Sequence, residues 1–492
     1  MMRVRLQVTG YRLQLILALI VIVMPAACEE RDSAGLLVVR RSVSAAEGVE
    51  IALANNPTIA ARRAAVAAFA ARADAAGSMT KLQLATTTFL TKASDQMILA
   101  SSPGVEPANI TMAPGRARAS QNFMLMYPLF TGGRLRSEEL AARSEIGSAS
   151  AEVVMAELDI ALAAKIAYDQ SLLARSYVEA YTRRVDESKE RVRIAEEAYE
   201  SGKIARYDLL RNRTDLADAQ QQLINSERDT QIADADLKRV LGVSQDSDLS
   251  LSDKLDSKPP AVILSAAKNL ALSKPVILSA AKNPALSKPV ILSGAKNPGP
   301  GGQILRDAQN DLAEALAHRP ELASARSMVS AAEAKLRAAK ATYLPQVYAV
   351  AMQDLGAIED ETPGHGSLIG LTASLPILDG GLRKSNLDEA RADLDRATAE
   401  QRDAVLNVSR DVSASSAEVN AAAKNVPLSR AAVEQAEEDY RVIKMRYDAG
   451  KSINVEVLDA LAALVRAQTN YADALYQHSV ARSKLARAIG RR

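Results

Sequence analysis

The sequence predicts a mainly α-helical protein with a smaller β portion, built as two internal repeats. Each repeat is expected to hold a pair of long antiparallel coiled-coil helices and two strands of membrane-spanning length. Three observations predict this architecture: paired motifs at a constant spacing, two very long stretches almost free of helix-breaking residues, and short strand-like segments ahead of each stretch.

The composition argues against an ordinary globular enzyme. Among 492 residues there are no tryptophans, four phenylalanines and thirteen tyrosines, few for a compact core because large rings bury the most area. The net charge of +2 lacks the basic excess that nucleic-acid binding needs. One cysteine and three histidines argue against a disulfide scaffold or a His/Cys metal cage. With no nucleophile or phosphate-loop motif, we expect neither catalysis nor a cofactor.

The first 28 residues have the pattern of a secretory signal peptide. Basic residues up to Arg12 precede an apolar run at 13–23, which is too short to span a bilayer as a helix. Small residues then lead to Cys28. Two interpretations of Cys28 remain open: lipidation as the first residue of a bacterial lipoprotein, or the end of an ordinary signal-peptide region. Either interpretation predicts an exported protein.

Paired motifs show that the chain is internally duplicated. Three anchor pairs all lie 248 positions apart: Pro128 with Pro376, Gly202 with Gly450, and Gly242 with Gly490. A further match, 52–57 with 315–320, has an offset of 263, so the first copy holds 15 extra residues. We assign the first repeat to 43–242 and the second to 312–490.

The longest stretches without breakers predict the main helices. Residues 134–201 and 382–449 are 68 residues each and dense in Ala, Glu, Arg and Leu, so a continuous helix would be about 100 Å long. A second helix is expected to return after each Tyr-x-x-Gly break, because its apolar residues recur at steps of seven. These residues are Leu209, Leu216, Leu223 and Leu237, and Val457, Leu464, Tyr471 and Leu485.

Strands are predicted before each Gly-Gly turn. The segments are rich in β-branched and aromatic residues, alternate partly at period two, and are bounded by Pro and Gly. Near ten residues, each matches a tilted transmembrane strand. The predicted strands are about 81–91, 120–130, 344–354 and 367–378.

The stretch between the repeats, 243–311, is predicted to be a disordered linker. Within 258–302, an eight-residue motif starting at Val262 returns at Val276 and, with one change, at Val290, at a period of 14. Its Pro, Gly and Ser content resists helix and core formation. We interpret it as an inserted sequence without a function of its own, at a position where the fold tolerates an insertion. The alternative is that it is a docking segment.

In this order and in duplicate, the motifs resemble the TolC-like outer-membrane efflux family. The resemblance rests on Ala-Leu-Ala-Asn-Asn-Pro at 52–57, the two Pro-[LI]-[FL]-x-Gly-Gly turns and the two Tyr-x-x-Gly-Lys hinges. It covers 43–490 apart from about 245–310. It implies a homotrimer that forms a trimeric α-barrel/β-barrel tunnel, with twelve strands in outer-membrane lipid and helices extending into the periplasm of a Gram-negative-type bacterium.

The same resemblance implies a function. The protein would be the outer-membrane channel of a tripartite efflux or type I secretion system. It would act as a passive exit duct for substrates delivered by an inner-membrane transporter through a periplasmic adaptor protein. The alternative is an exported coiled-coil scaffold without channel activity, in which the strand-like segments would be loops.

By resemblance, the periplasmic entrance lies at the turns between each long helix and its return, with Gly202 and Gly450 as hinges. Glu456 and Asp459 correspond to the acidic residues of the entrance. Three copies would bring six carboxylates around the pore mouth, creating a negative potential that favours cations.

Two further residues belong to this gate. Asp208 occupies the matching position of the first repeat, where it could accept a hydrogen bond from Tyr447. Ser452 stands where the family often has a basic residue, which puts an inherited inter-subunit latch in doubt. The alternative is that Glu456, Asp459 and Asp208 are solvated acids favoured by helix N-terminal dipoles.

Overall fold

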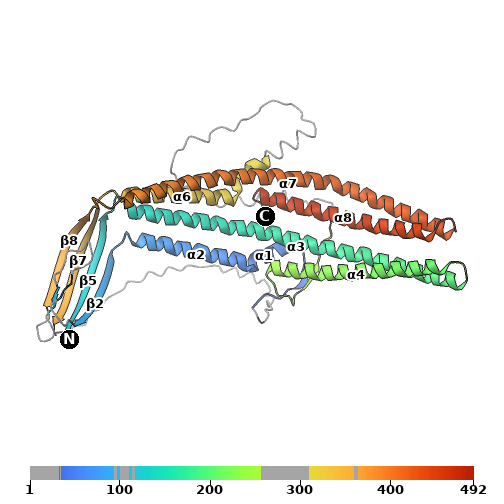
Figure 1. Cartoon of the computed structure of the whole chain (residues 1–492), viewed down its shortest axis with the longest axis horizontal. Coiled ribbons are helices and arrows are strands. Elements are labelled where there is room, and N and C mark those ends of the chain that lie inside the picture. Colours follow the sequence, from blue (N-terminus) through green and yellow to red (C-terminus); the bar gives the residue numbers. More distant parts are fainter. Residues whose placement is uncertain are drawn as a thin grey trace, which may run out of the picture.

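The structure is a computed structural model that describes residues 33, 35–92, 97–99, 110–112, 117–255, 310–358 and 364–492. The predicted signal peptide (1–28), Cys28 and the 14-residue repeats at 258–302 lie outside the described residues. The molecule is a long rod, with a β-sheet at one end and the tips of two helical hairpins at the other (Figure 1).

Two helices of 67 residues, α3 (Arg134–Glu200) and α7 (Leu382–Asp448), confirm the predicted long helices. Each starts after a Gly-Gly pair with left-handed backbone, as at Gly133 and Gly381. Helix α4 (Arg206–Leu241) returns along α3, and α8 (Asn454–Ala488) returns along α7. The result is two antiparallel hairpins with tips at the same end of the rod (Figure 1).

Shorter helices cover the half of each long helix that lies nearer to the sheet. These are α1 (Ala45–Asn55) and α2 (Pro57–Ser78), which pack on α3, and α6 (Pro320–Ala341), which packs on both α3 and α7. Both α2 and α6 begin with proline, which suits the first helical position because its missing N–H would have no partner there. Residues 310–318 are also helical.

Within the described ranges, none of the helices combines the length and apolarity needed to cross a membrane.

Four strands form one antiparallel sheet in the order β2-β5-β7-β8. Their bounds are β2 (Gln83–Lys92), β5 (Ala117–Phe130), β7 (Gln346–Ile358) and β8 (Gly364–Ser374). Two short strands, β3 (Met97–Leu99) and β4 (Ile110–Met112), pair with each other. The prediction of a strand through 378 is wrong, since β8 ends at Ser374 and Pro376 lacks the N–H that a ladder requires.

The register of the sheet separates two faces, because side chains directly opposite in neighbouring strands share a face. One face is the more apolar of the two, with Leu84 opposite Leu125 and Ala349 opposite Leu371. The other is more polar and includes Thr87 opposite Asn122 and Gln346 opposite Ser374. On the more apolar face the large apolar side chains of the outer strands β2 and β8 are exposed: Leu84 is 69%, Leu371 71% and Ile369 87% exposed.

The start of the predicted linker is ordered, which corrects the boundary at 243. Strand β6 (Asp248–Leu251) pairs in parallel with β1 (Arg40–Val43), more than 200 residues earlier. Apolar residues of this pair join α1, α3 and α4 in a buried cluster that includes Val43, Tyr168, Leu237 and Leu241. The segment 243–255 is therefore part of the fold rather than disordered sequence.

Candidate functional site at the hairpin tips

Both predicted hinges are tight turns whose backbone requires glycine. At the first tip, Gly202 has φ +72°, and the N–H of Lys203 donates to the carbonyl of Ala198 at 2.8 Å. At the second, Gly450 has φ +71°, and Lys451 makes the same bond over 2.7 Å. This pattern ends a helix by using a left-handed residue to satisfy a free carbonyl. A β-carbon would meet no atom within 4 Å at either position. Glycine is therefore required there by the backbone conformation and not by a lack of space.

The acidic residues lie at the start of the return helices, as predicted. Asp208 is half-buried in the first turn of α4, and Glu456 is exposed in the first turn of α8. Asp459 is exposed one turn further along α8. The Ser452 hydroxyl donates to the Glu456 carboxylate. This contact ties the turn after Gly450 to the first turn of α8, so Ser452 has a local role that its identity alone did not suggest.

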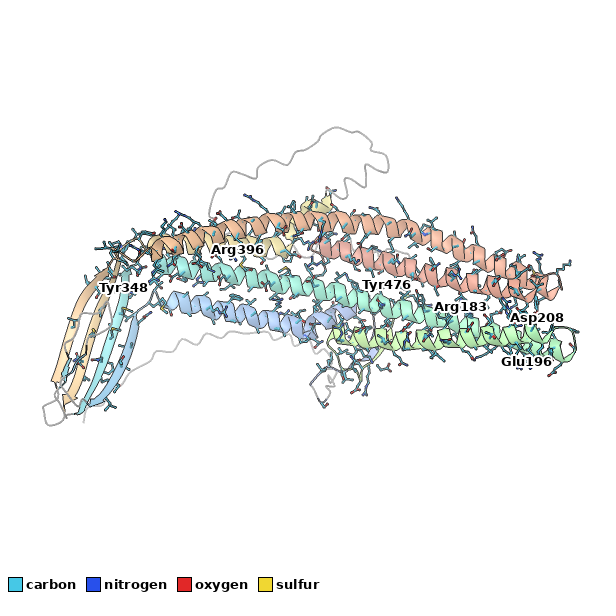
Figure 2. All side chains as sticks on the ribbon, viewed as in Figure 1. Arg183, Glu196, Asp208, Tyr348, Arg396 and Tyr476 are labelled. Carbon is cyan, nitrogen blue, oxygen red and sulfur yellow. The ribbon has the colours of Figure 1, made fainter. Side chains whose placement is uncertain are left out.

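The expected hydrogen bond between Asp208 and Tyr447 is not formed in this structure. Tyr447 is half-buried at the end of α7. Among the hydrogen bonds of the described residues, none joins its hydroxyl to Asp208. The Asn212 amide donates to the backbone carbonyl of Asp208, at 2.9 Å. Figure 2 shows Asp208 at the tip of the α3–α4 hairpin.

A polar cluster instead joins the two hairpins seven residues before Tyr447. The Tyr440 hydroxyl on α7 donates to the Glu187 carboxylate on α3 at 2.8 Å. Lys444 donates to the same carboxylate oxygen at 3.1 Å, and Arg191 donates to the Tyr440 hydroxyl at 3.2 Å. The guanidinium of Arg191 and the ammonium of Lys444 also lie 5.8 and 5.7 Å from the Tyr440 ring centre. We call these four residues the inter-hairpin cluster.

Contacts within the inter-hairpin cluster shift the pKa values of Glu187 and Tyr440 in opposite directions. Burial raises the pKa of the Glu187 carboxyl, but hydrogen bonds from Tyr440 and Lys444 outweigh it, so this pKa lies below its ordinary value. Burial, together with the bond to Glu187, raises the pKa of Tyr440. At neutral pH, Glu187 therefore stays ionised and Tyr440 stays protonated, which are the forms that the contact needs.

Sequence reasoning missed the inter-hairpin cluster. The two helices that form it are about 250 residues apart in sequence, and no local pattern reports contacts at that separation. A weak signal was present, because Tyr440 precedes Tyr447 by one heptad and the two residues therefore lie on the same side of α7. In the described ranges, no group of three His, Cys, Asp or Glu side chains is arranged to hold a metal ion.

Comparisons with curated proteins reveal relatives over part of the chain. It is 26% identical over 194 residues to the outer membrane protein OprJ of Pseudomonas aeruginosa, a match covering 38% of this chain and 40% of OprJ. It is 27% identical over 132 residues to the outer membrane protein TolC of Escherichia coli, covering 27% of each chain. The matches thus span less than half of these relatives.

Solved structures match over almost the whole rod. The outer membrane protein VceC of Vibrio cholerae has a TM-score of 0.67 at 18% identity, with 91% of this chain and 96% of VceC covered. The CmeC outer membrane channel of Campylobacter jejuni has a TM-score of 0.68 at 16% identity, with 91% and 85% covered. At these identities the likeness establishes the fold.

The sequence profile described as outer membrane efflux protein matches residues 48–243 and 312–491. The matched ranges contain both long hairpins and all four strands of the main sheet. They leave out the 14-residue repeats between them. The chain therefore belongs to the outer membrane efflux protein family, whose members are TolC-like proteins of the Gram-negative outer membrane.

Proposed function

We propose that three copies of this chain form an outer-membrane channel whose sheet lies in lipid and whose hairpins extend the tunnel into the periplasm. The observation that carries the proposal is the two-faced sheet. Its more apolar face has exposed leucine and isoleucine side chains that lipid contact favours, and its more polar face suits a water-filled lumen. A coiled-coil scaffold, the alternative function, has no use for such a sheet.

The unpaired edges of the sheet support the homotrimer. In the described part of the chain, neither β2 nor β8 pairs with a strand on its outer edge. Open edges cannot persist in lipid, because their backbone N–H and C=O groups would have no partner. Three copies with β8 of one beside β2 of the next would close a barrel of twelve strands. Apolar residues exposed along the helices support the same assembly: Leu210, Ile224, Ile232, Leu406 and Leu428.

Relatives of this chain support the proposed role of passive exit duct. Two relatives in Pseudomonas putida are named as outer membrane proteins of efflux pumps. In this proposal an inner-membrane transporter supplies the energy, and a periplasmic adaptor connects that transporter to the channel. We place the adaptor contacts at the tips, 199–212 and 447–460.

The assembly can be tested by the native mass of protein extracted from outer membranes in mild detergent. The proposal expects a particle of three chains in that fraction. A soluble periplasmic monomer or dimer, absent from the outer membrane, would refute the channel and favour the scaffold.

Removing the acidic residues of the second tip tests whether they line the entrance. In the double variant Glu456→Ala/Asp459→Ala, the trimer loses six carboxylates from the proposed mouth. We expect block by a multivalent cation to weaken about tenfold, because converging like charges concentrate counter-ions. Single-channel recording in planar bilayers measures both block and conductance.

A matched control removes two exposed acids from α7 near the sheet, as Glu389→Ala/Asp395→Ala. This variant carries the same charge change, but a multivalent cation should block its channel as strongly as it blocks the wild-type channel. Unchanged block and conductance in the Glu456→Ala/Asp459→Ala channel would show that these residues are only helix N-terminal acids.

A pair of tyrosine variants tests where the hairpins are held together. Tyr440→Phe removes the hydrogen bond to Glu187, a contact of roughly 1 kcal/mol for a partly exposed charged acceptor. We expect about a fivefold larger open population in single-channel recordings. Tyr447→Phe should leave gating unchanged, because the Tyr447 hydroxyl makes no hydrogen bond in the described structure. If only Tyr447→Phe opened the channel, the gate predicted from the sequence would be right and the inter-hairpin cluster would be merely structural.

A further inference from the structure

Four consecutive residues of α3 bond to three different parts of the fold. Tyr168, Asp169, Gln170 and Ser171 lie near the middle of α3, and Figure 2 labels Tyr476, the partner of Gln170 on α8. We call them the α3 node. Their partners are, in order, Val43 and Asp253 in and after the β1–β6 pair, Ser479 and Tyr476 on α8, and Asp234 on α4. The node therefore joins the first hairpin, the second hairpin and the β1–β6 pair.

Asp169 is the buried charge of this node. It is only 9% exposed, and its carboxylate accepts a hydrogen bond from the Ser479 hydroxyl at 2.6 Å. This bond crosses from α3 to α8, so it lies in the seam between the hairpins. Burial raises the pKa of Asp169 to about 6, although the bond from Ser479 and the charge of Lys165 act in the opposite direction.

The charged and titratable groups around Asp169 come from each element packed against it. Lys165 lies one turn earlier on α3, and burial lowers its pKa. Asp253, after β6, adds a like charge that favours the protonated form of Asp169. On α8, burial raises the pKa of Tyr476, which therefore stays neutral. On α4, Asp234 is paired with Arg175 at 3.2 Å.

We propose that the α3 node is a proton-responsive joint, which holds α3 against α8 more tightly in acid than in neutral surroundings. The cause is the unequal cost of burial, because a closed seam excludes water from a charged carboxylate that an open seam would hydrate. The closed seam consequently binds a proton more strongly than the open one.

The direction of the pH effect follows from linkage. With the seam open, Asp169 titrates near its ordinary value of 3.8, and with the seam closed near 6. Protonation therefore stabilises the closed seam as the pH falls through 6, and this stabilisation is absent at pH 8. Between pH 8 and pH 5 the closed-to-open ratio should rise about tenfold.

Pulsed EPR distances between spin labels at Glu179 on α3 and Asn470 on α8 test the joint in the full-length, detergent-extracted protein. Both positions are exposed, and Cys28 is replaced by serine in every sample to leave only the labelled sites. The wild type should shift toward the shorter distance by about tenfold in population ratio from pH 8 to pH 5. Asp169→Asn, which cannot titrate, should give the same distribution at both pH values.

Two more variants keep the test specific. Asp159→Asn alters another contact from α3 to α8, with Arg487, but Asp159 is largely exposed, so the pH response should remain. Ser479→Ala removes a bond that favours the charged carboxylate and should move the midpoint of the response to higher pH. A distance distribution that is unchanged with pH in the wild type, or a pH shift that survives in Asp169→Asn, would overturn the proposal.

The effect of the joint on transport rests on the proposed channel function, but the distance measurement does not. A pH-dependent distance in a protein without conductance would support the joint and refute the channel. A conducting trimer without the distance change would support the channel and refute the joint.

Discussion

Replacing Arg319 by leucine is expected to destabilise the packing of α6, α7 and α8 by about 3 kcal/mol. The side chain of Arg319 is 1% exposed and meets three partners from three helices. It donates to the carbonyl of Ala488 at the end of α8 at 2.8 Å, to Glu321 on α6 at 2.7 Å and to Asp411 on α7 at 3.0 Å.

The large expected effect comes from the polar groups that lose a partner when Arg319 is replaced. Without the guanidinium, the carbonyl of Ala488 loses its donor inside the protein, and two partly buried carboxylates lose a cation. Leaving buried polar groups without a partner costs more than the bonds themselves contribute. The loss of helical circular dichroism on heating the detergent-extracted protein should begin at a lower temperature.

Arg410→Leu is the matched control, since Arg410 binds the same Asp411 carboxylate at 2.8 Å but its side chain is 74% exposed. Solvent screens such a pair, so the cost should stay below about 1 kcal/mol. Equal losses in the two variants would mean that the burial of Arg319 is not what makes it important.

The sequence predicted the long helices to within one residue because the signals that end them are local. Each is bounded by a Gly-Gly turn on one side and by Gly202 or Gly450 on the other, and the intervening residues favour helix throughout. Pro427 lies inside α7 without ending it, because packing along the hairpin outweighs the loss of one backbone hydrogen bond.

The features that the sequence did not predict all depend on distant contacts. Strands β1 and β6 have four residues each, and only their pairing across more than 200 residues stabilises them. For that reason 243–255 resembled the adjoining low-complexity linker. The same limit applied at the site: the turns of Gly202 and Gly450 were identified, whereas the bond from Tyr440 to Glu187 required the relative placement of two hairpins.

Glycine variants at two helix ends should separate backbone strain from steric conflict. Gly242 ends α4 with φ +69°, and a β-carbon there would lie 2.8 Å from the backbone oxygen of Asn55. Gly242→Ala should therefore cost about 1–2 kcal/mol for the left-handed backbone, plus a similar amount for displacing the turn between α1 and α2. That turn cannot move freely, because the Asn56 amide donates to the carbonyl of Val240 at 3.0 Å.

Gly202→Ala is the comparison that isolates the backbone term. Its φ is +72°, but nothing lies within 4 Å of the added carbon. This variant should lose only that backbone cost of about 1–2 kcal/mol, and its thermal unfolding should begin closer to that of the wild type. Gly242→Ala should unfold at a clearly lower temperature in the same detergent. Equal stability of the two variants would mean that the turn at Asn55 yields without cost, and that the end of α4 is not fixed against α1 and α2 as the structure has it.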